Sequence, residues 1–159
     1  MSDYIAELRE AIARSHPLLE KISDEQSRQR RAAGKWSPRE IIGHLVDSAS
    51  NNHQRFVRAQ FQDSLLFPGY EQDAWVDRQG YHDAPWRELL SLWSSFNLHL
   101  ARVMELTPTE DRTRPRTNHN LDQIAWKPIP KTEPATLDYF MADYVGHLKH
   151  HLAQILGPR

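Results

Sequence analysis

The sequence contains no cysteine, no excess of charge of either sign and no long hydrophobic run. Without cysteine, the chain cannot form disulfides, cysteine-ligated zinc sites, iron–sulfur clusters or a thiol nucleophile. His, Asp and Glu are then the strong metal ligands that it can offer. No uncharged stretch approaches the roughly 18 residues that cross a bilayer. We therefore expect a soluble, cytoplasmic protein with no membrane partner.

The charged residues are balanced, with 20 Lys and Arg against 21 Asp and Glu, so that the formal net charge is −1. Proteins that bind DNA or RNA usually carry a strong basic excess that attracts phosphates. Since this chain lacks one, we expect no nucleic-acid partner. Its 159 residues suit one hydrophobic core better than two, which predicts a single domain over residues 1–159.

Apolar residues spaced three and four apart predict four long helices. The expected helices cover residues 3 to 26, 38 to 60, 86 to 106 and 137 to 156. Pro17 should kink or restart the first helix, because proline has no N–H for the preceding turn. The string Ser37-Pro38-Arg39-Glu40 marks the start of the second, with Ser37 as cap and Glu40 closing a capping box.

Strand signals are scarce, because no segment alternates apolar and polar residues convincingly. The two long connections, about 61 to 84 and 107 to 136, contain most of the ten prolines. A connection of this length can cross the whole length of a helix bundle, and long irregular loops often carry function. The sequence therefore predicts an all-α four-helix bundle with two long connecting loops.

Three histidines occupy inward positions of these helices. The apolar stripe of the last helix continues from Tyr144 to His147 and His151, one turn apart. His44 lies about 9 Å from the start of the second helix, and the other two lie about 14 and 8 Å from the end of the last. If the two helices are antiparallel, all three imidazoles reach a similar level. They could then bind a divalent metal and leave coordination positions open, although an inward histidine can also be a hydrogen-bonded core residue.

Three strings in the sequence resemble the DinB/YfiT-like superfamily. They are Trp36-Ser37-Pro38-Arg39-Glu40-Ile41-Ile42-Gly43-His44-Leu45-Val46-Asp47-Ser48, Gly69-Tyr70-Glu71-Gln72-Asp73-Ala74-Trp75 and Asp143-Tyr144-Val145-Gly146-His147-Leu148-Lys149-His150-His151-Leu152-Ala153-Gln154-Ile155. The resemblance covers nearly the whole chain. It implies a four-helix bundle with up-down-down-up topology, usually dimeric, that holds a divalent metal through His44, His147 and His151. The better understood members of this superfamily are thiol-dependent transferases that use bacillithiol or mycothiol, and its YfiT-like members are described as candidate metal-dependent hydrolases, so the resemblance implies one of these two activities.

Other polar residues could support the metal or the substrate. A metal-bound histidine usually donates its second N–H to an acceptor, and Asp47, three residues after His44, is the better candidate for a supporting carboxylate, ahead of Asp143. His150 could complete a closed metal shell. The arginines of the second loop could collect an anionic substrate, although a solvated charge run is the simpler interpretation; they are Arg112, Arg114 and Arg116. Spacing alone identifies no catalytic acid or base.

The leading hypothesis is a divalent-metal-dependent enzyme that transfers a low-molecular-weight thiol or hydrolyses a small substrate. Zinc and nickel suit three nitrogens and a water best, and iron and manganese stay open. The alternative is a non-catalytic, metal- or ligand-binding stress-response module, because fold and site type do not fix a reaction. We expect a small-molecule substrate and, from the resemblance alone, a homodimer.

Overall fold

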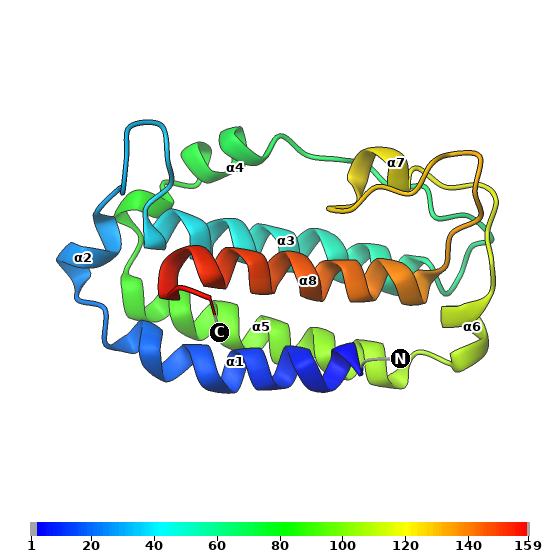
Figure 1. Cartoon of the computed structure of the whole chain (residues 1–159), viewed down its shortest axis with the longest axis horizontal. Helices are drawn as coiled ribbons and strands as arrows, with labels where there is room; N and C mark the ends of the chain where they lie inside the picture. Colours follow the sequence, from blue (N-terminus) through cyan, green and yellow to red (C-terminus); the bar gives the residue numbers. More distant parts are fainter. Residues whose placement is uncertain (1–2, 159) are drawn as a thin grey trace.

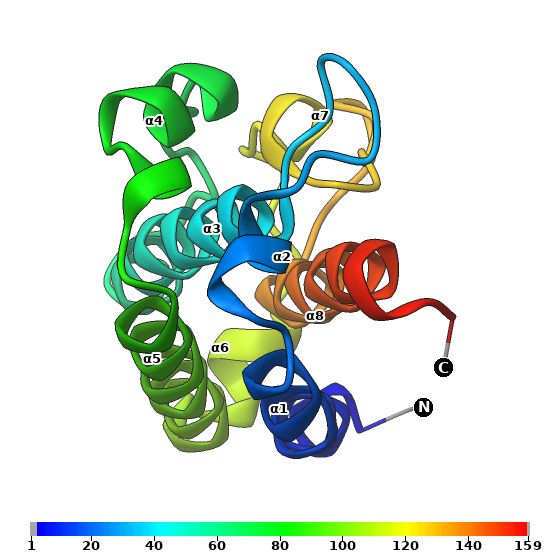
Figure 2. The same ribbon diagram turned by 90° about the vertical axis from the view of Figure 1, so that its left-hand side faces the viewer.

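The computed structural model describes residues 3–158, and four long helices form the bundle. They are α1 (Tyr4–Glu20), α3 (Pro38–Arg58), α5 (Trp86–Leu106) and α8 (Leu137–Leu156). Viewed from one end, they occupy the four corners of the bundle (Figure 2). Short helices fill the connections: α2 (Asp24–Arg28), α4 (Gln72–Arg78), the 3-10 turn η1 (Tyr81–Asp83), α6 (Thr109–Thr113) and α7 (Leu121–Ile124).

The long helices follow the expected up-down-down-up order. α1 and α8 run in one direction, and α3 and α5 run in the other (Figure 1). Side-chain contacts agree: Arg9 near the start of α1 pairs with Glu105 near the end of α5. Phe56 near the end of α3 packs on Phe140 near the start of α8, with 5.7 Å between the ring centroids. α3 and α8 are therefore antiparallel neighbours, as a shared histidine level requires.

Local signals place most helix ends correctly. The Ser37 hydroxyl accepts a hydrogen bond from the backbone N–H of Glu40, and the Glu40 carboxylate accepts one from the backbone N–H of Ser37, so the expected capping box opens α3. α1 continues through Pro17 to Glu20, so the helix does not restart at this proline, and its expected end at residue 26 is wrong. Pro17 is exposed and lies in the last turn, and the carbonyl that its missing N–H leaves without a helical donor belongs to Ala13, which is also exposed. The chain breaks instead at residues 21–23, and α2 follows as a separate helix.

Each long helix contributes fully buried side chains to one core. Among them are Leu8, Leu45, Trp93 and Leu148, each at most 1% exposed. The Tyr144 hydroxyl donates a hydrogen bond to the side-chain oxygen of Asn97 inside this core, so two buried polar groups satisfy each other. The bundle is thus held by apolar burial along its axis.

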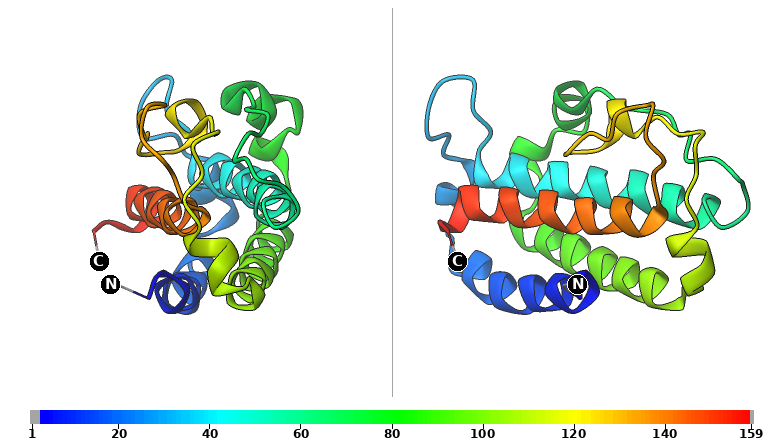
Figure 3. Two further views of the ribbon diagram at one scale, coloured as in Figure 1. Left: turned by 90° about the vertical axis from the view of Figure 1, so that its right-hand side faces the viewer. Right: turned by 45° about the vertical axis from the view of Figure 1, so that its right-hand side comes forward.

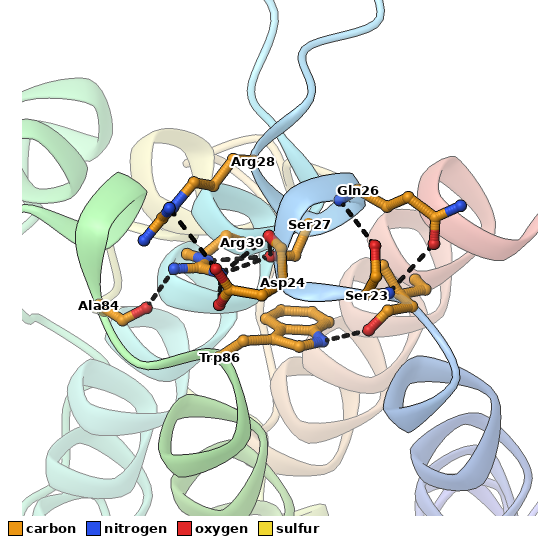
Figure 4. Close-up of polar contacts among 9 residues, drawn as sticks. Ser23, Asp24, Gln26, Ser27, Arg28, Arg39, Ala84 and Trp86 are labelled. Carbon is orange, nitrogen blue, oxygen red and sulfur yellow. Dashed lines mark hydrogen bonds and ion pairs between the residues drawn. The ribbon is translucent and has the colours of Figure 1, made fainter.

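A polar cluster around Arg39 joins α2 and the loop before α5 to the start of α3 (Figure 4). The Arg39 guanidinium, which is fully buried, donates to the Ala84 carbonyl at 2.6 Å, to the Ser27 hydroxyl and to the Asp24 carboxylate. Nearby, the Trp86 indole N–H donates to the backbone of the α1–α2 connection. Every nitrogen of this guanidinium has an oxygen partner, so the cluster is closed.

The two long connections pair with each other over α3 and α8 (Figure 1), and the views of Figure 3 place them on the same side of the bundle. Leu65 donates its N–H to the Asn118 carbonyl and accepts from the Asn120 N–H. The Asn120 side chain also bonds both backbone groups of Phe67. These connections are therefore an ordered cover over two helices. Over the described residues, no helix has the length and apolar character needed to cross a bilayer.

Candidate metal centre

The side chains of His44, His147 and His151 converge, as the helical spacing predicts. The Nε2 atom of His147 lies 3.3 Å from Nε2 of His44 and 3.1 Å from Nε2 of His151. Ligand atoms of all three lie within 4.8 Å of one another. α3 supplies the first imidazole and α8 the other two, so the cluster joins two antiparallel helices.

Burial keeps these imidazoles neutral. Burial, and then the nearby imidazole of His151, lower the pKa of His44 to about 3. Burial, and then the neighbouring imidazoles, lower the pKa of His147 to about 3 as well. The pKa of His151 is lowered mainly by burial. At neutral pH each imidazole therefore has one ring nitrogen with a lone pair available for a metal, while its other ring nitrogen keeps its proton.

The donor set fits a divalent cation. Nitrogens that lie about 2.0–2.1 Å from one tetrahedral ion are roughly 3.3 Å apart, which matches the two short separations at His147. His44 is fully buried, and its Nδ1 atom has no hydrogen-bond partner among the described residues. Three imidazole nitrogens that face one another cannot all satisfy one another with protons, whereas a shared cation would satisfy them together.

The expected hydrogen bond between His44 and Asp47 is not formed. Oδ1 of Asp47 instead accepts from the Tyr81 hydroxyl at 2.7 Å and from the Gln79 amide at 2.8 Å. Its Oδ2 atom is buried without a partner in the described part of the chain, and burial raises the pKa of the carboxyl group. Asp47 therefore attaches the segment after α4 to α3, and its contacts do not orient the His44 ring.

Asp143 also has a structural task. Its two carboxylate oxygens accept the backbone N–H groups of Trp126 and Lys127 at 2.8 and 2.9 Å, so this residue fixes the second connection on α8. His150 is exposed and lies outside the three-histidine group. Its ring shares a contact with the Gln154 amide.

The arginines of the second loop have structural partners. Arg112 bonds the Tyr4 hydroxyl, Arg114 pairs with Asp63, and Arg116 donates to backbone carbonyls. None of the three lines the cavity beside the histidines. The suggestion that they collect a substrate is therefore not supported by their positions.

A glycine precedes two of the three histidines and admits an aromatic ring. A Cβ atom on Gly43 would overlap the Tyr81 ring, and one on Gly146 would come within 3.0 Å of the Trp126 ring. Both rings belong to the connections, so each glycine lets a connection pack directly beside a candidate ligand. Trp36 covers another side of the cluster, with its ring centroid 4.8 Å from that of His44.

A cavity of about 360 Å³ opens beside the histidines, between α3, α8 and the two connections. His147 and His151 form part of its wall. Its other polar lining residues include Ser48, Asn52, Arg55 and Tyr70. The first three were not predicted as site residues from the sequence, although their spacing from His44 by 4, 8 and 11 residues places them along one helix face.

Comparison with known proteins agrees with this architecture. A sequence model of the DinB superfamily matches residues 7–155. The chain belongs to the DinB superfamily. Among members with similar sequences, "Putative metal-dependent hydrolase YfiT" of Bacillus subtilis is 24% identical over 152 residues, which cover 96% of this chain and 80% of YfiT. "Putative metal-dependent hydrolase OB0782" of Oceanobacillus iheyensis is 26% identical over 136 residues, covering 84% and 71% of the two chains.

A solved structure of YfiT superposes on this DinB-superfamily fold with a TM-score of 0.78 and 22% identity, covering 98% of this chain and 86% of that one. It is described as a probable metal-dependent hydrolase with an unusual four-helix bundle topology. The likeness confirms the expected all-helical bundle. The convergence of the three histidines is a feature of this structure, and their role as ligands stays a prediction.

Proposed function

We propose that the protein is a divalent-metal-dependent enzyme that hydrolyses a small substrate or transfers a low-molecular-weight thiol to an electrophile. The observation that carries the proposal is the convergence of three neutral imidazoles beside a cavity. His44, His147 and His151 would hold the ion. A divalent cation held by three neutral ligands lowers the pKa of a water or thiol that it binds, which supplies a nucleophile although the chain has no cysteine.

The absence of a fourth protein ligand favours catalysis over a purely structural ion. Within residues 3–158, the candidate ligand group contains three histidines and no carboxylate. Structural zinc sites usually have four protein ligands, whereas catalytic sites keep one position open. The two residues that could have closed the shell, His150 and Asp47, lie outside the group. Zinc and nickel remain the favoured ions, with iron and manganese as further candidates.

The cavity wall also constrains how protons are handled. Burial raises the pKa of Tyr70 to about 12, so its hydroxyl stays protonated at neutral pH and can donate a hydrogen bond. Asp143 faces the same cavity, but both of its oxygens already accept backbone N–H groups. We therefore assign Tyr70 as a hydrogen-bond donor toward a bound substrate and assign no general base.

Metal content tests the proposed site. Untagged, chelator-free protein should contain about one divalent ion per chain by elemental analysis, and His147→Ala should lose it. His150→Ala is the matched control, because its imidazole lies on the same helix outside the group. Unchanged metal content and affinity in His147→Ala would show that the site is assigned wrongly.

Ligand stabilisation then separates an enzyme from a passive metal protein. Low-molecular-weight thiols are screened for a rise in melting temperature that occurs in the metal-loaded protein and is absent from the metal-free protein. Thiols that stabilise the loaded form are assayed for transfer to electrophiles, and nitrophenyl esters are assayed for hydrolysis. Metal binding without a metal-dependent ligand or turnover would favour the non-catalytic alternative.

A further inference from the structure

The cavity has a second functional group at the end away from the histidines. Arg55, on α3, lines it and is only 5% exposed. The guanidinium carbon lies 5.9 Å from the ring centroids of both Tyr70 and Phe140. A charged group that is buried between two aromatic rings at a cavity wall can contribute strongly to ligand binding, because water screens it poorly.

The position of Arg55 relative to the histidines follows from the helix geometry. His44, Ser48, Asn52 and Arg55 follow one another at intervals of four, four and three residues, so that they lie along one face of α3. α8 runs antiparallel to it, and Phe140, which the guanidinium contacts, precedes His147 by seven residues. Seven residues correspond to about 10 Å of helix rise. The cavity thus has the imidazoles near one end and the Arg55 guanidinium about 10 Å further along it.

The charge of Arg55 is not neutralised by a carboxylate among the described residues. Its guanidinium donates hydrogen bonds to two neutral acceptors, the Pro68 carbonyl at 2.8 Å and the Asn52 amide oxygen at 3.4 Å. Since a guanidinium has five N–H donors, several remain for another acceptor. Burial lowers the pKa of Arg55, which shows that its surroundings disfavour the uncompensated cation.

Two other buried arginines show what distinguishes this one. Arg39 is compensated by the Asp24 carboxylate and faces no cavity of the site. Arg116 donates to the carbonyls of Ala59 and Asp111 and likewise does not line the cavity. Among the described residues that line the cavity, Asp143 supplies the one carboxylate, and it accepts two backbone N–H groups. Arg55 alone among these three arginines combines burial, neutral acceptors and access to a ligand.

We propose that Arg55 binds an anionic group of the substrate, a carboxylate or phosphate, while the reacting part of the same molecule lies at the three histidines. The substrate class is then an elongated organic anion whose charge is about 10 Å from its reacting atom. This assignment rests on the proposed function for the reacting end. The anion site itself does not need the metal, because its contacts come from the protein.

Three probes separate the two ends of the cavity. 8-Mercaptooctanoate carries a thiol and a carboxylate, 8-mercaptooctan-1-ol carries the thiol alone, and octanoate carries the carboxylate alone. Each is titrated by calorimetry into zinc-loaded and metal-free protein, and octyl phosphate replaces octanoate in a parallel titration. The variants are Arg55→Gln, which keeps a donor for the Pro68 carbonyl, and Arg58→Gln, an exposed control one turn further along α3.

In the wild type, 8-mercaptooctanoate should bind the zinc form at least about tenfold more tightly than the alcohol, because a charge-assisted hydrogen bond is added. Arg55→Gln should remove this preference, and Arg58→Gln should keep it. Octanoate or octyl phosphate should bind the metal-free wild type and bind Arg55→Gln about tenfold more weakly. Equal affinity of the acid and the alcohol for the wild type, or a preference that survives in Arg55→Gln, would overturn the proposal.

The titrations distinguish a failure of the anion site from a failure of the metal site. If thiol binding is independent of zinc while the binding of octanoate or octyl phosphate depends on Arg55, the metal hypothesis fails and the anion site stands. Circular dichroism checks that Arg55→Gln is folded. Should it unfold, the Nε–H resonance of Arg55 in ¹⁵N-labelled wild type gives the decision, since octanoate or octyl phosphate should shift it and octanol should not. An unmoved resonance would contradict the anion site.

Discussion

Two buried polar clusters lie near the first half of α3, and they are built in opposite ways. Around Arg39, donors meet acceptors: its three guanidinium nitrogens bond a hydroxyl, a carbonyl and a carboxylate (Figure 4). Around His44, imidazole nitrogens face one another instead. Nε2 of His147 lies 3.3 Å from Nε2 of His44 and 3.1 Å from Nε2 of His151. The first cluster is complete within the protein, whereas the second lacks a partner that a cation would provide.

This difference separates structural from functional polar groups. A buried group that is satisfied by its own chain stabilises or specifies the fold, and it offers nothing to a ligand. A buried polar group that faces only groups of its own kind, as the imidazoles do, lacks a full set of hydrogen-bond partners. Its burial therefore has a desolvation cost, which a bound ligand or ion can offset. Arg55 lies between the two cases, because neutral acceptors satisfy part of its guanidinium and the rest lines the cavity.

The largest expected effect comes from replacing His44 by leucine. His44→Leu should weaken divalent-metal affinity by at least about 100-fold, because one of three ligands is lost. The metal-free protein should keep its melting temperature or gain stability, since an apolar side chain replaces a buried imidazole with an unpartnered nitrogen. Metal titration and thermal unfolding of the metal-free form check this. A strongly destabilised metal-free variant would mean that the imidazoles hold the fold.

The reverse behaviour is expected of Arg39→Met. Removing the guanidinium leaves the Ser27 hydroxyl and the Ala84 carbonyl without their donor, and we expect a loss of roughly 2–4 kcal/mol in the free energy of unfolding. Metal stoichiometry of the folded protein should stay near one. Denaturant unfolding at neutral pH measures the loss. Loss of metal at unchanged stability would break the comparison between the two clusters.

Acid should destabilise the metal-free protein through the histidine cluster. Burial lowers the pKa of His44 and His147 to about 3 in the fold, while the unfolded chain binds protons at about pH 6.5. Between these values the unfolded state binds more protons, so the free energy of unfolding falls as the pH decreases. The fall is at most about 1.4 kcal/mol per pH unit for each imidazole. It should begin between pH 6.5 and 5, above the carboxylate range, and be shallower in His44→Leu.

A smaller effect is expected where a connection packs beside the site. In Gly43→Ala the new Cβ atom would overlap the Tyr81 ring, so the ring must move away from Asp47. Overpacking of this kind costs about 1–3 kcal/mol. Gly69→Ala is the matched control, because its Cβ would meet only Ile124 at an ordinary 3.8 Å. Equal melting temperatures for the two variants would show that the close approach at Gly43 is unimportant.

Local sequence signals predicted the helices well and their connections poorly. The capping box at Ser37 depends on neighbouring residues, and the predicted starts of α3 and α8 were correct. The pairing of Leu65 with the second connection depends on residues more than fifty positions apart, which no local pattern records. The short helices α4, α6 and α7 were missed for the same reason, because their stability comes from tertiary contacts.

The candidate site shows the same division. Helical periodicity and rise brought His44, His147 and His151 to one level, as the structure confirms. Periodicity also predicted that Asp47 lies close enough to His44 to accept a hydrogen bond from it. Helical spacing does not determine which donor a carboxylate binds, and Asp47 accepts from the Tyr81 hydroxyl instead. Tyr81 enters only because Gly43 leaves room for its ring. Arg55 lies on the same face of α3 as His44. The helical spacing of polar residues after His44 would have identified Arg55 as a candidate site residue.

The smallest expected effect is that of Asp47→Asn on metal affinity. A carboxylate that oriented His44 would cost 10- to 100-fold in affinity when changed. In this structure the acceptor oxygen serves Tyr81 and Gln79, and an asparagine oxygen can accept the same hydrogen bonds. We therefore expect metal affinity within about threefold of the wild type. Metal titration measures this affinity. Asp143→Asn is titrated as the control, because the Asp143 carboxylate fixes the second connection. A tenfold loss of metal affinity confined to Asp47→Asn would show that Asp47 does orient His44. The histidine cluster would then depend on hydrogen bonds within the protein, as the Arg39 cluster does.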